Sequence, residues 1–569
     1  MQRGAFVSTA DPGLPADIGS SVPQAASRSV GVIALSALCF VLTVNLYGSE
    51  SLVQSVGPMI AIALLLVAPV LVFYPYVLMV SELSCAIPCR AGAVRWASVV
   101  CPPFATYTFA IWTVLLNVLD LSMGVLAFTN YLDVAMAPQR LAPGWLAVLR
   151  IALVLVCVLV NVAGPTLLSR AAILACVMSV LPFLLLLGLQ IPQGLSPDGF
   201  NWQPSKVAPQ ADGASLLVPN TDWSAAFIML GAFYAGLESI GTLVLTIEHP
   251  EKAITRAFIA TATVGFTALT AGIVAIAGSS RAQALPDRWG AGFFYQASVA
   301  IGGRFLGTMF FVGLSFNTLA FLIASILSAS HGLAGMGEMN VFPDRVSSWL
   351  AVMRPTPCDV DRLCAGGASS SDIANSEASR NPAVPSLIPA HALALLAVLA
   401  SVVAVNLNFA TVLALDQILV SARMLLIVAT FVSLRQMYPS MPRPFKAWRI
   451  DRETAITEGG TRGGSTELGP LRSRTDAAAE GDETSAGGQA TYRHSRWMWI
   501  AAVVVSTFPL GTIALAASSA SGSFFLVLLG LLGLPVLLGA AIERVLGRTW
   551  NEHPMEALCA ARKAAQCAS

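Results

Sequence analysis

Long apolar blocks recur along the chain from residue 31 onward, and they constrain the fold more than any other feature. A transmembrane helix needs about 20 mostly apolar residues, whereas a soluble chain of this size disperses its apolar residues at helix or strand period. Only 11% of the residues are charged, against about 25% in an average soluble domain. The balanced charge, with a formal net value of +1, argues against a nucleic-acid binder, which needs a basic face. The sequence therefore predicts an all-α polytopic membrane protein and argues against a soluble enzyme.

About twelve segments are long and apolar enough to span a bilayer. Several are longer than a straight crossing requires, which indicates tilted, broken or extended helices. The approximate ranges are 31–56, 58–87, 103–135, 143–163, 167–191, 223–247, 254–279, 292–330, 386–406, 408–434, 497–518 and 522–543.

Lysine and arginine are distributed unevenly between alternate loops. With a cytoplasmic N-terminus, the outward segments carry only Arg140, Lys206, Arg281 and Arg288, and the inward segments carry most of the 32 basic residues. The positive-inside rule therefore places both termini in the cytoplasm.

The same pattern divides the chain into parts. We expect a cytoplasmic tail over 1–30, a ten-helix core over 31–434, two peripheral helices over 497–543 and a cytoplasmic tail over 544–569. A loop near 355–384 inside the core, and most of the loop over 435–496, are rich in small, polar and charged residues. Such composition offers too little apolar surface to offset ordering entropy, so we expect both loops to be disordered.

Two apolar segments are interrupted at corresponding positions. Residues 44–58 read VNLYGSESLVQSVGP in the first span, and residues 230–241 read LGAFYAGLESIG in the sixth. Irregular backbone at membrane depth survives only where protein or a water-filled cavity covers it. For either segment alone, glycines that permit close helix packing are an equal explanation. The pair, five spans apart, favours a transporter with two inverted five-helix repeats and a substrate site between the broken helices.

Ionisable side chains inside membrane spans are candidates for function. Glu238 lies at the sixth-span break and is our first candidate for proton coupling and for binding a cation, with Asp120 of the third span second. We assign four other residues to gate or structural roles: Glu50, Glu82, Asp416 and Arg423. Asp416 and Arg423, seven residues apart, share a helix face and are expected to form a packed ion pair or separate gate contacts.

Several acidic side chains near one cavity would attract cationic amines and protons and repel organic anions. Tyr47, Phe233 and Tyr234 stand beside the acidic residues in the sequence and offer ring faces for cation–π contacts with an ammonium group. We therefore expect a small cationic amine or an amino acid as substrate, with the proton as coupling ion and sodium as the less favoured alternative. No cofactor or metal is expected.

Several motifs together resemble one known family. They are LYGSESLVQSVGP (46–58), YPYVLMVSELSCAIPCRAGAVRW (74–96), Asp120 followed by NYL (130–132), FYAGLES with EHPEK (233–239 and 248–252) and RQMYPSMPRPFK (435–446). The chain resembles the amino acid–polyamine–organocation superfamily, and most closely its polyamine/cation symporter branch in plants and kinetoplastids. The resemblance implies a LeuT-like core of ten helices plus two peripheral ones, alternating access and proton-driven uptake. It also implies that Gly48 and Ser49 offer backbone groups to the substrate and that Glu238 and Asp120 face the site.

From residues and resemblance together we expect a plasma-membrane, proton-coupled importer of polyamines such as putrescine or spermidine. An amino acid permease is the first alternative, and a transporter-like nutrient sensor that signals through its long loops is the second. A vacuolar or lysosome-like membrane is the alternative location. The lipid bilayer is the expected surrounding, nucleic acid is not an expected partner, and the sequence identifies no protein partner. The sequence shows no nucleophile motif, phosphate loop or metal-ligand cluster, so we expect no enzymatic activity.

Overall fold

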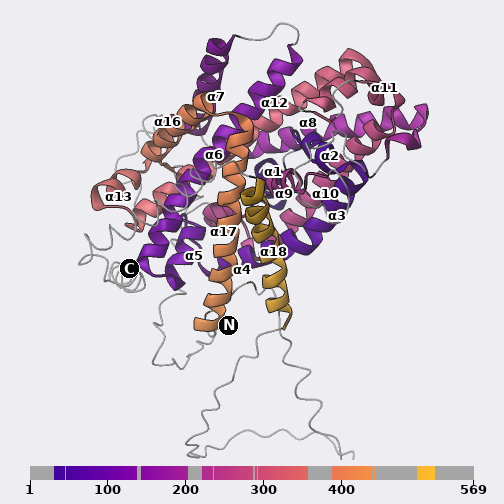
Figure 1. Cartoon of the computed structure of the whole chain (residues 1–569). Helices are drawn as coiled ribbons and strands as arrows, with labels where there is room; N and C mark the ends of the chain where they lie inside the picture. Colours follow the sequence, from indigo (N-terminus) through magenta and orange to yellow (C-terminus); the bar gives the residue numbers. More distant parts are fainter. Residues whose placement is uncertain are drawn as a thin grey trace, which may run out of the picture.

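The computed structural model describes an almost entirely helical bundle (Figure 1). The described residues are 31–44, 46–136, 142–163, 165–200, 202, 221–234, 236–285, 289–290, 292–355, 387–438, 441, 443, 445 and 496–519. The predicted twelfth span, both tails and both long loops lie largely or wholly outside these residues.

Within this part of the chain, eight helices are long and apolar enough to cross a membrane, and three apolar helices are shorter. The prediction of an all-α polytopic membrane protein is thereby confirmed. The helices are α1 (Val32–Thr43), α2 (Glu50–Val56), α3 (Pro58–Ala68), η1 (Pro69–Phe73), α4 (Tyr74–Ala86), α5 (Ala93–Val100), α6 (Pro103–Ala135), α7 (Pro143–Ala163), α8 (Pro165–Gln190), η2 (Ile191–Gln193), η3 (Pro197–Gly199), α9 (Trp223–Ala232), η4 (Leu237–Thr246), α10 (Pro250–Ala277), α11 (Ser280–Gln283), α12 (Phe293–Glu338), α13 (Asp344–Leu350), α16 (Ala390–Asn406), α17 (Phe409–Met437) and α18 (Arg496–Ser519).

The first span is broken where the sequence predicts it. Helix α1 ends at Thr43, and helical structure resumes only at Glu50. Between them Gly48 has φ 99°, a conformation that glycine adopts without the steric penalty that a side chain would add. The break therefore depends on the backbone freedom of this glycine.

The sixth span is broken in a different way. Helix α9 ends at Ala232, Gly236 takes the left-handed conformation with φ 87°, and η4 continues as a 3-10 helix. A Cβ on Gly236 would lie 3.1 Å from the carbonyl oxygen of Leu42, so a side chain here would crowd α1. Runs of 3-10 helix as long as η4 are uncommon and often mark strain or a hinge.

The two broken spans pack against each other crosswise. Helix α1 contacts η4, and α2 contacts α9, so the first half of each span meets the second half of the other near the centre of the bundle (Figure 1). This is the contact pattern of two antiparallel segments, as expected when five-helix repeats are inverted.

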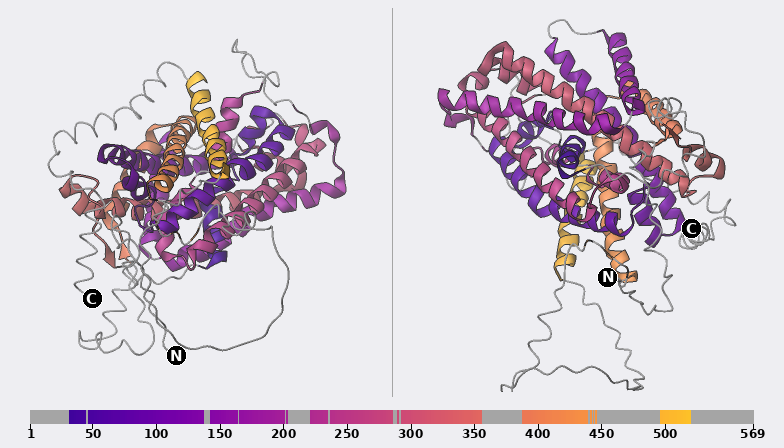
Figure 2. Two further views of the ribbon diagram at one scale, coloured as in Figure 1. Left: turned by 90° about the horizontal axis from the view of Figure 1, so that it is seen from below. Right: turned by 180° about the vertical axis from the view of Figure 1, so that it is seen from behind.

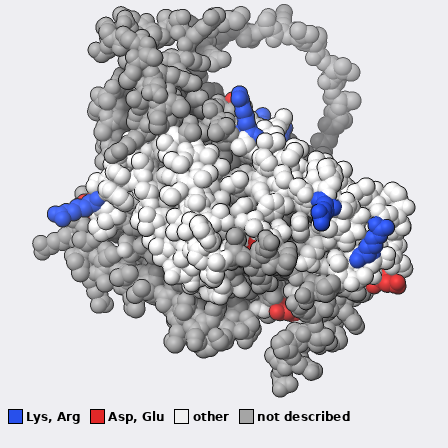
Figure 3. Space-filling model, turned by 90° about the horizontal axis from the view of Figure 1, so that it is seen from above, with Lys and Arg blue, Asp and Glu red and all other residues white. Residues whose placement is uncertain are grey.

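The surface of the bundle matches a lipid environment. Large apolar side chains such as Trp145, Leu159 and Val503 are exposed on α7 and α18, and the described face seen from above carries few charged side chains (Figure 3). Helix α18 lies beside α17 in each view (Figures 1 and 2). Helix α12, at 46 residues, is too long for one straight crossing, and Gly303 with φ 72° interrupts it near its N-terminal end.

One short strand pair accompanies the helices. Strands β1 (Arg354–Pro355) and β2 (Leu387–Ile388) are antiparallel, with Arg354 opposite Ile388. They join the two sides of the loop predicted near 355–384, and the interior of that loop lies outside the described residues.

Candidate functional site

Glu238 is the centre of a buried charge cluster, by which we mean Asp120, Glu238, Asp416 and Arg423. Its carboxylate accepts a hydrogen bond from an Arg423 Nη2 in an ion pair. Its other oxygen accepts a hydrogen bond from the Tyr76 hydroxyl at 3.2 Å. Only about one-twentieth of the Glu238 and Arg423 surfaces is exposed (5% each). The break in the sixth span therefore places a carboxylate in the protein interior, between α4 and α17.

Asp416 and Asp120 bring the number of carboxylates in this cluster to three. Asp416 lies on α17, is 1% exposed and accepts a hydrogen bond from Gln417 Nε2 at 3.0 Å, while its Oδ1 has no hydrogen-bond partner among the described residues. Asp120 interacts electrostatically with both Arg423 and Glu238. The cluster thus contains one guanidinium and three carboxylates. It therefore carries excess negative charge whenever all three carboxylates are ionised.

Asp120 differs from the other members because it is partly exposed. Its neighbours on α6, Leu119 and Leu121, are buried at 6% and 2% exposure. Asp120 also interacts electrostatically with the buried Arg423 and Glu238. Asp120 is therefore the most exposed member of the charge cluster.

A second acidic site lies at the first-span break. Glu50 is fully buried (0% exposed), accepts a hydrogen bond from the Gly48 backbone N–H at 2.8 Å and accepts another from the Tyr131 hydroxyl of α6. The Ser49 hydroxyl donates to the Leu46 carbonyl at 2.8 Å. These polar groups are therefore engaged in holding the break together.

The three predicted aromatic residues separate into two groups. The Tyr47 ring packs edge-on against Tyr131 and Phe183, with centroids 6.0 and 5.7 Å apart, beside Glu50. The Tyr234 ring lies 4.5 Å from Phe73, and its hydroxyl donates to the Leu65 carbonyl at 3.3 Å. The described environment of Tyr234 is therefore α3 and η1.

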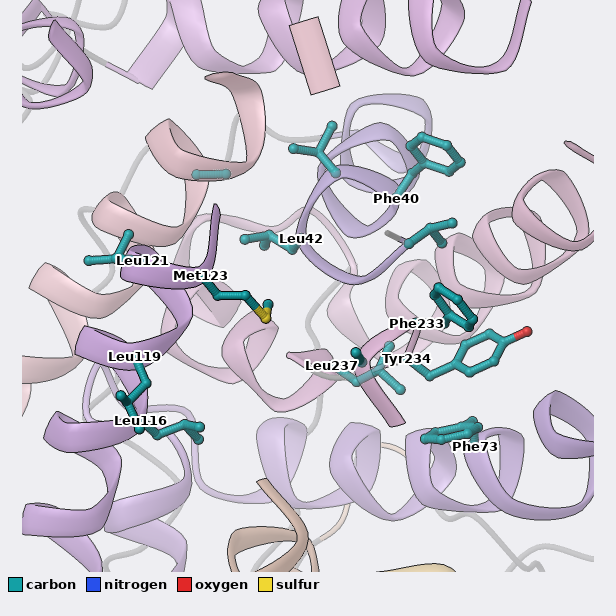
Figure 4. Close-up of a cluster of buried hydrophobic side chains, with 14 of the residues drawn as sticks. Phe40, Leu42, Phe73, Leu116, Leu119, Leu121, Met123, Phe233, Tyr234 and Leu237 are labelled. Atoms are coloured by element: carbon teal, nitrogen blue, oxygen red, sulfur yellow. The ribbon is translucent and has the colours of Figure 1, made fainter. Parts of the chain in front are cut away.

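Phe73, Phe233 and Tyr234 lie in an apolar cluster whose opposite side includes leucines of α6 (Figure 4). Tyr234 faces Phe73 on one side of this cluster, and Leu119 and Leu121 lie on the other side. Phe233 is 1% exposed and belongs to the same apolar core. Phe233 and Tyr234 are thus packed into the apolar core.

Glu82 lies apart from both acidic sites. It forms ion pairs with Arg435, near the end of α17, and with Arg443, at 3.3 Å from the Arg443 Nε. Arg435 also packs its guanidinium over the Phe431 ring at 4.9 Å. Glu82 therefore joins the end of α4 to the end of α17 and to the segment that follows it.

Sequence reasoning missed the partners of these acids. Tyr76 and Tyr131 are hydroxyl donors to Glu238 and Glu50 from other spans, and Arg423 pairs with Glu238 across 185 positions of sequence. The available signal was that Tyr131 lies inside the NYL motif and Tyr76 inside the motif over 74–96. In the described part of the chain no group of three or more His, Cys, Asp or Glu residues is arranged to hold a metal ion.

Comparison with known proteins agrees with a membrane carrier. The family model described as amino acid permease matches residues 25–456. The chain is 25% identical to Polyamine transporter RMV1 of Arabidopsis thaliana over 406 residues, which cover 70% of this chain and 71% of that protein. It is 27% identical to Polyamine transporter PUT1 of Oryza sativa subsp. japonica over 342 residues, which cover 58% of this chain and 59% of that protein.

Among solved structures, one match is MHP1, a nucleobase-cation-symport-1 family transporter, in a closed conformation with bromovinylhydantoin bound. The TM-score is 0.44 and the identity 15%, over 72% of this chain and 80% of that one. The family match extends from before α1 to beyond α17, so it includes both broken spans and the whole charge cluster.

Proposed function

We propose that this chain, which belongs to the amino acid permease family, imports polyamines such as putrescine or spermidine across the plasma membrane by proton-coupled alternating access. The family and the relatives make it a membrane transporter and not an enzyme. The observation that carries the choice of substrate is the buried charge cluster, in which three carboxylates stand against one guanidinium.

A dication would match the charge of the cluster in its fully ionised form. With all three carboxylates ionised, the cluster holds two negative charges in excess, which equals the charge of a diamine with two ammonium groups. Carboxylates within a protein interior interact strongly with such cations because the local dielectric constant is low. In the proposal Glu238 and Asp120 bind the ammonium groups, and Glu238 also takes up the coupling proton.

The second half of each broken span supports the same choice. An amino acid needs donors for its carboxylate, and the N-terminal end of a broken half-helix is the usual source. Here the Gly48 N–H, just before α2, already donates a hydrogen bond to the Glu50 carboxylate. Glu238 lies in the first turn of η4. A substrate carboxylate would meet a protein carboxylate at both positions.

The crosswise packing of the broken spans supports alternating access. Because α1 contacts η4 and α2 contacts α9, a rocking of one repeat against the other would act on both breaks together. The positive-inside pattern supports an orientation with both termini in the cytoplasm.

Radiolabelled putrescine uptake in a transport-deficient host tests the proposal. Uptake is measured at two external pH values, with and without a protonophore, in cells with confirmed surface expression. We expect uptake that rises at acid pH and collapses with the protonophore. Absence of uptake from cells that carry the protein at the surface would overturn the proposal.

An amino acid permease is the second candidate, because the matching family carries that description. Competition against labelled substrate separates the two candidates. Displacement by putrescine or spermidine, and not by arginine or leucine, is the expected result. Displacement by arginine or leucine alone would establish the permease instead.

A further inference from the structure

In this structure Glu238 is already paired with a cation, the guanidinium of Arg423. Its Nη2 donates to Glu238 Oε1 in a pair whose side chains are 7% and 5% exposed. The Nε of the same guanidinium has no hydrogen-bond partner among the described residues. The hydrogen bond of the guanidinium is therefore to the carboxylate that the proposed function gives to the substrate.

Two other carboxylates interact electrostatically with the same guanidinium. Asp416 lies two turns before Arg423 on α17, about 10 Å along the axis, interacts with it electrostatically and has an unpartnered Oδ1 in the described structure. Asp120 of α6 also interacts with Arg423. An arginine side chain is long and flexible enough to exchange partners, because its donors project at the end of a mobile stem.

We propose that Arg423 is a tethered cation which neutralises Glu238 in the substrate-free protein and which the substrate's ammonium group must displace. This inference rests on the proposed function, since it requires a substrate that carries an organic ammonium. Arg423 thereby acts as a positioning and specificity residue: neutral or anionic compounds have no means of replacing it.

The exchange also has a structural consequence. Glu238 stands on η4, the irregular half of the sixth span, and Arg423 stands on α17. Displacement of the guanidinium breaks the ion pair that connects these two elements. Substrate binding would in this way release the broken span at the same moment as it fills the site.

Putrescine kinetics of Arg423→Gln test the competition. Without the tethered cation we expect the apparent KM to fall about tenfold, within the usual range of coupling free energies, and the maximal rate to fall because release is slower. Arg423→Lys keeps a tethered cation and should retain a KM near that of the wild type. Loss of packing alone predicts the opposite sign, so a KM that rises or stays constant in Arg423→Gln at equal surface expression would overturn the inference.

Arg435→Gln is the matched control. It removes a guanidinium from another ion pair on the same helix, the partly buried pair with Glu82. We expect lower thermal stability and no gain in putrescine affinity. An equal fall of KM in Arg435→Gln would show that any loss of charge on α17 has this effect, and would overturn the inference.

A binding measurement covers the case in which variants fold poorly or the substrate is not a polyamine. The full-length Arg423→Gln variant is purified with and without ethylammonium chloride, and its Tm is compared with that in sodium chloride of equal ionic strength. We expect ethylammonium to raise the Tm of the variant more than that of the wild type. No difference, or a variant that cannot be recovered even with the amine present during expression and purification, would overturn the inference. Wild-type uptake decides the proposed function separately.

Discussion

Arg423 and Glu238 form a buried ion pair that connects α17 to the irregular half of the sixth span. Both side chains lie inside a bundle whose exterior is largely apolar, where an uncompensated charge is costly. The pair therefore combines two roles: it neutralises the carboxylate at the break, and it fixes the position of the break relative to α17.

The stability of this pair gives the first prediction. Glu238→Gln and Arg423→Gln should each lower the Tm of the purified full chain, because removal of one partner of a buried pair costs roughly 3–5 kcal/mol. The double variant should recover part of the loss, since it leaves no unpaired charge from this pair. Thermal unfolding of the four proteins in one detergent is the measurement. Additive losses in the double variant would contradict a direct interaction.

Much of the fold could be predicted from the sequence. The apolar blocks correspond to helices wherever the structure describes them, and the runs around Gly48 and Gly236 are broken where glycine and acidic residues interrupt them. These features are local, because they depend on hydropathy and on backbone freedom. The division of α12 at Gly303 was not located, since a single glycine inside a long apolar run also fits an unbroken helix.

The site could be predicted only in part. Glu238 and Asp120 were chosen as charges inside spans, and the structure brings them within electrostatic reach of each other. The pairing of Arg423 with Glu238, rather than its position beside Asp416, depends on which helices become neighbours. That information is absent from the spacing along one helix. The same applies to Tyr131, whose hydroxyl reaches Glu50 from another span.

Proton coupling gives the second prediction. Glu238→Gln should abolish proton-driven accumulation of putrescine, because the amide can neither take up the coupling proton nor attract the ammonium group. Accumulation against a gradient is measured as a function of external pH. Glu251→Gln, on a partly exposed carboxylate at the start of α10, is the control and should accumulate substrate normally. Wild-type pH dependence in Glu238→Gln would remove Glu238 from the coupling mechanism.

Selectivity between amines gives the third prediction. Asp120→Asn should raise the apparent KM for diamines more than for monoamines, because only the diamine uses a second carboxylate. Inhibition of putrescine uptake by each amine provides the comparison. Asp133→Asn makes the same chemical change about 20 Å away on α6 and should affect both amines equally or not at all. Equal shifts in Asp120→Asn would exclude an ammonium-binding role.

Backbone freedom at the first break gives the last prediction. A Cβ on Gly48 would meet no atom within 4 Å, so the effect of Gly48→Ala depends on its φ of 99° alone. A conformation of this kind costs roughly 1–3 kcal/mol in a residue with a side chain. We expect a lower Tm and slower uptake, since the Gly48 N–H that holds Glu50 would be displaced.

Gly188→Ala is the matched control for this substitution. Gly188 lies in α8, also has no atom within 4 Å of an added Cβ, and has an ordinary helical conformation. Alanine in a helix interior is more favourable than glycine by roughly 0.5–1 kcal/mol, so this variant should be as stable as the wild type or slightly more so. If the two variants are equally stable and equally active, the first break does not depend on the left-handed conformation of Gly48, and Glu50 is held by Tyr131 without help from the backbone.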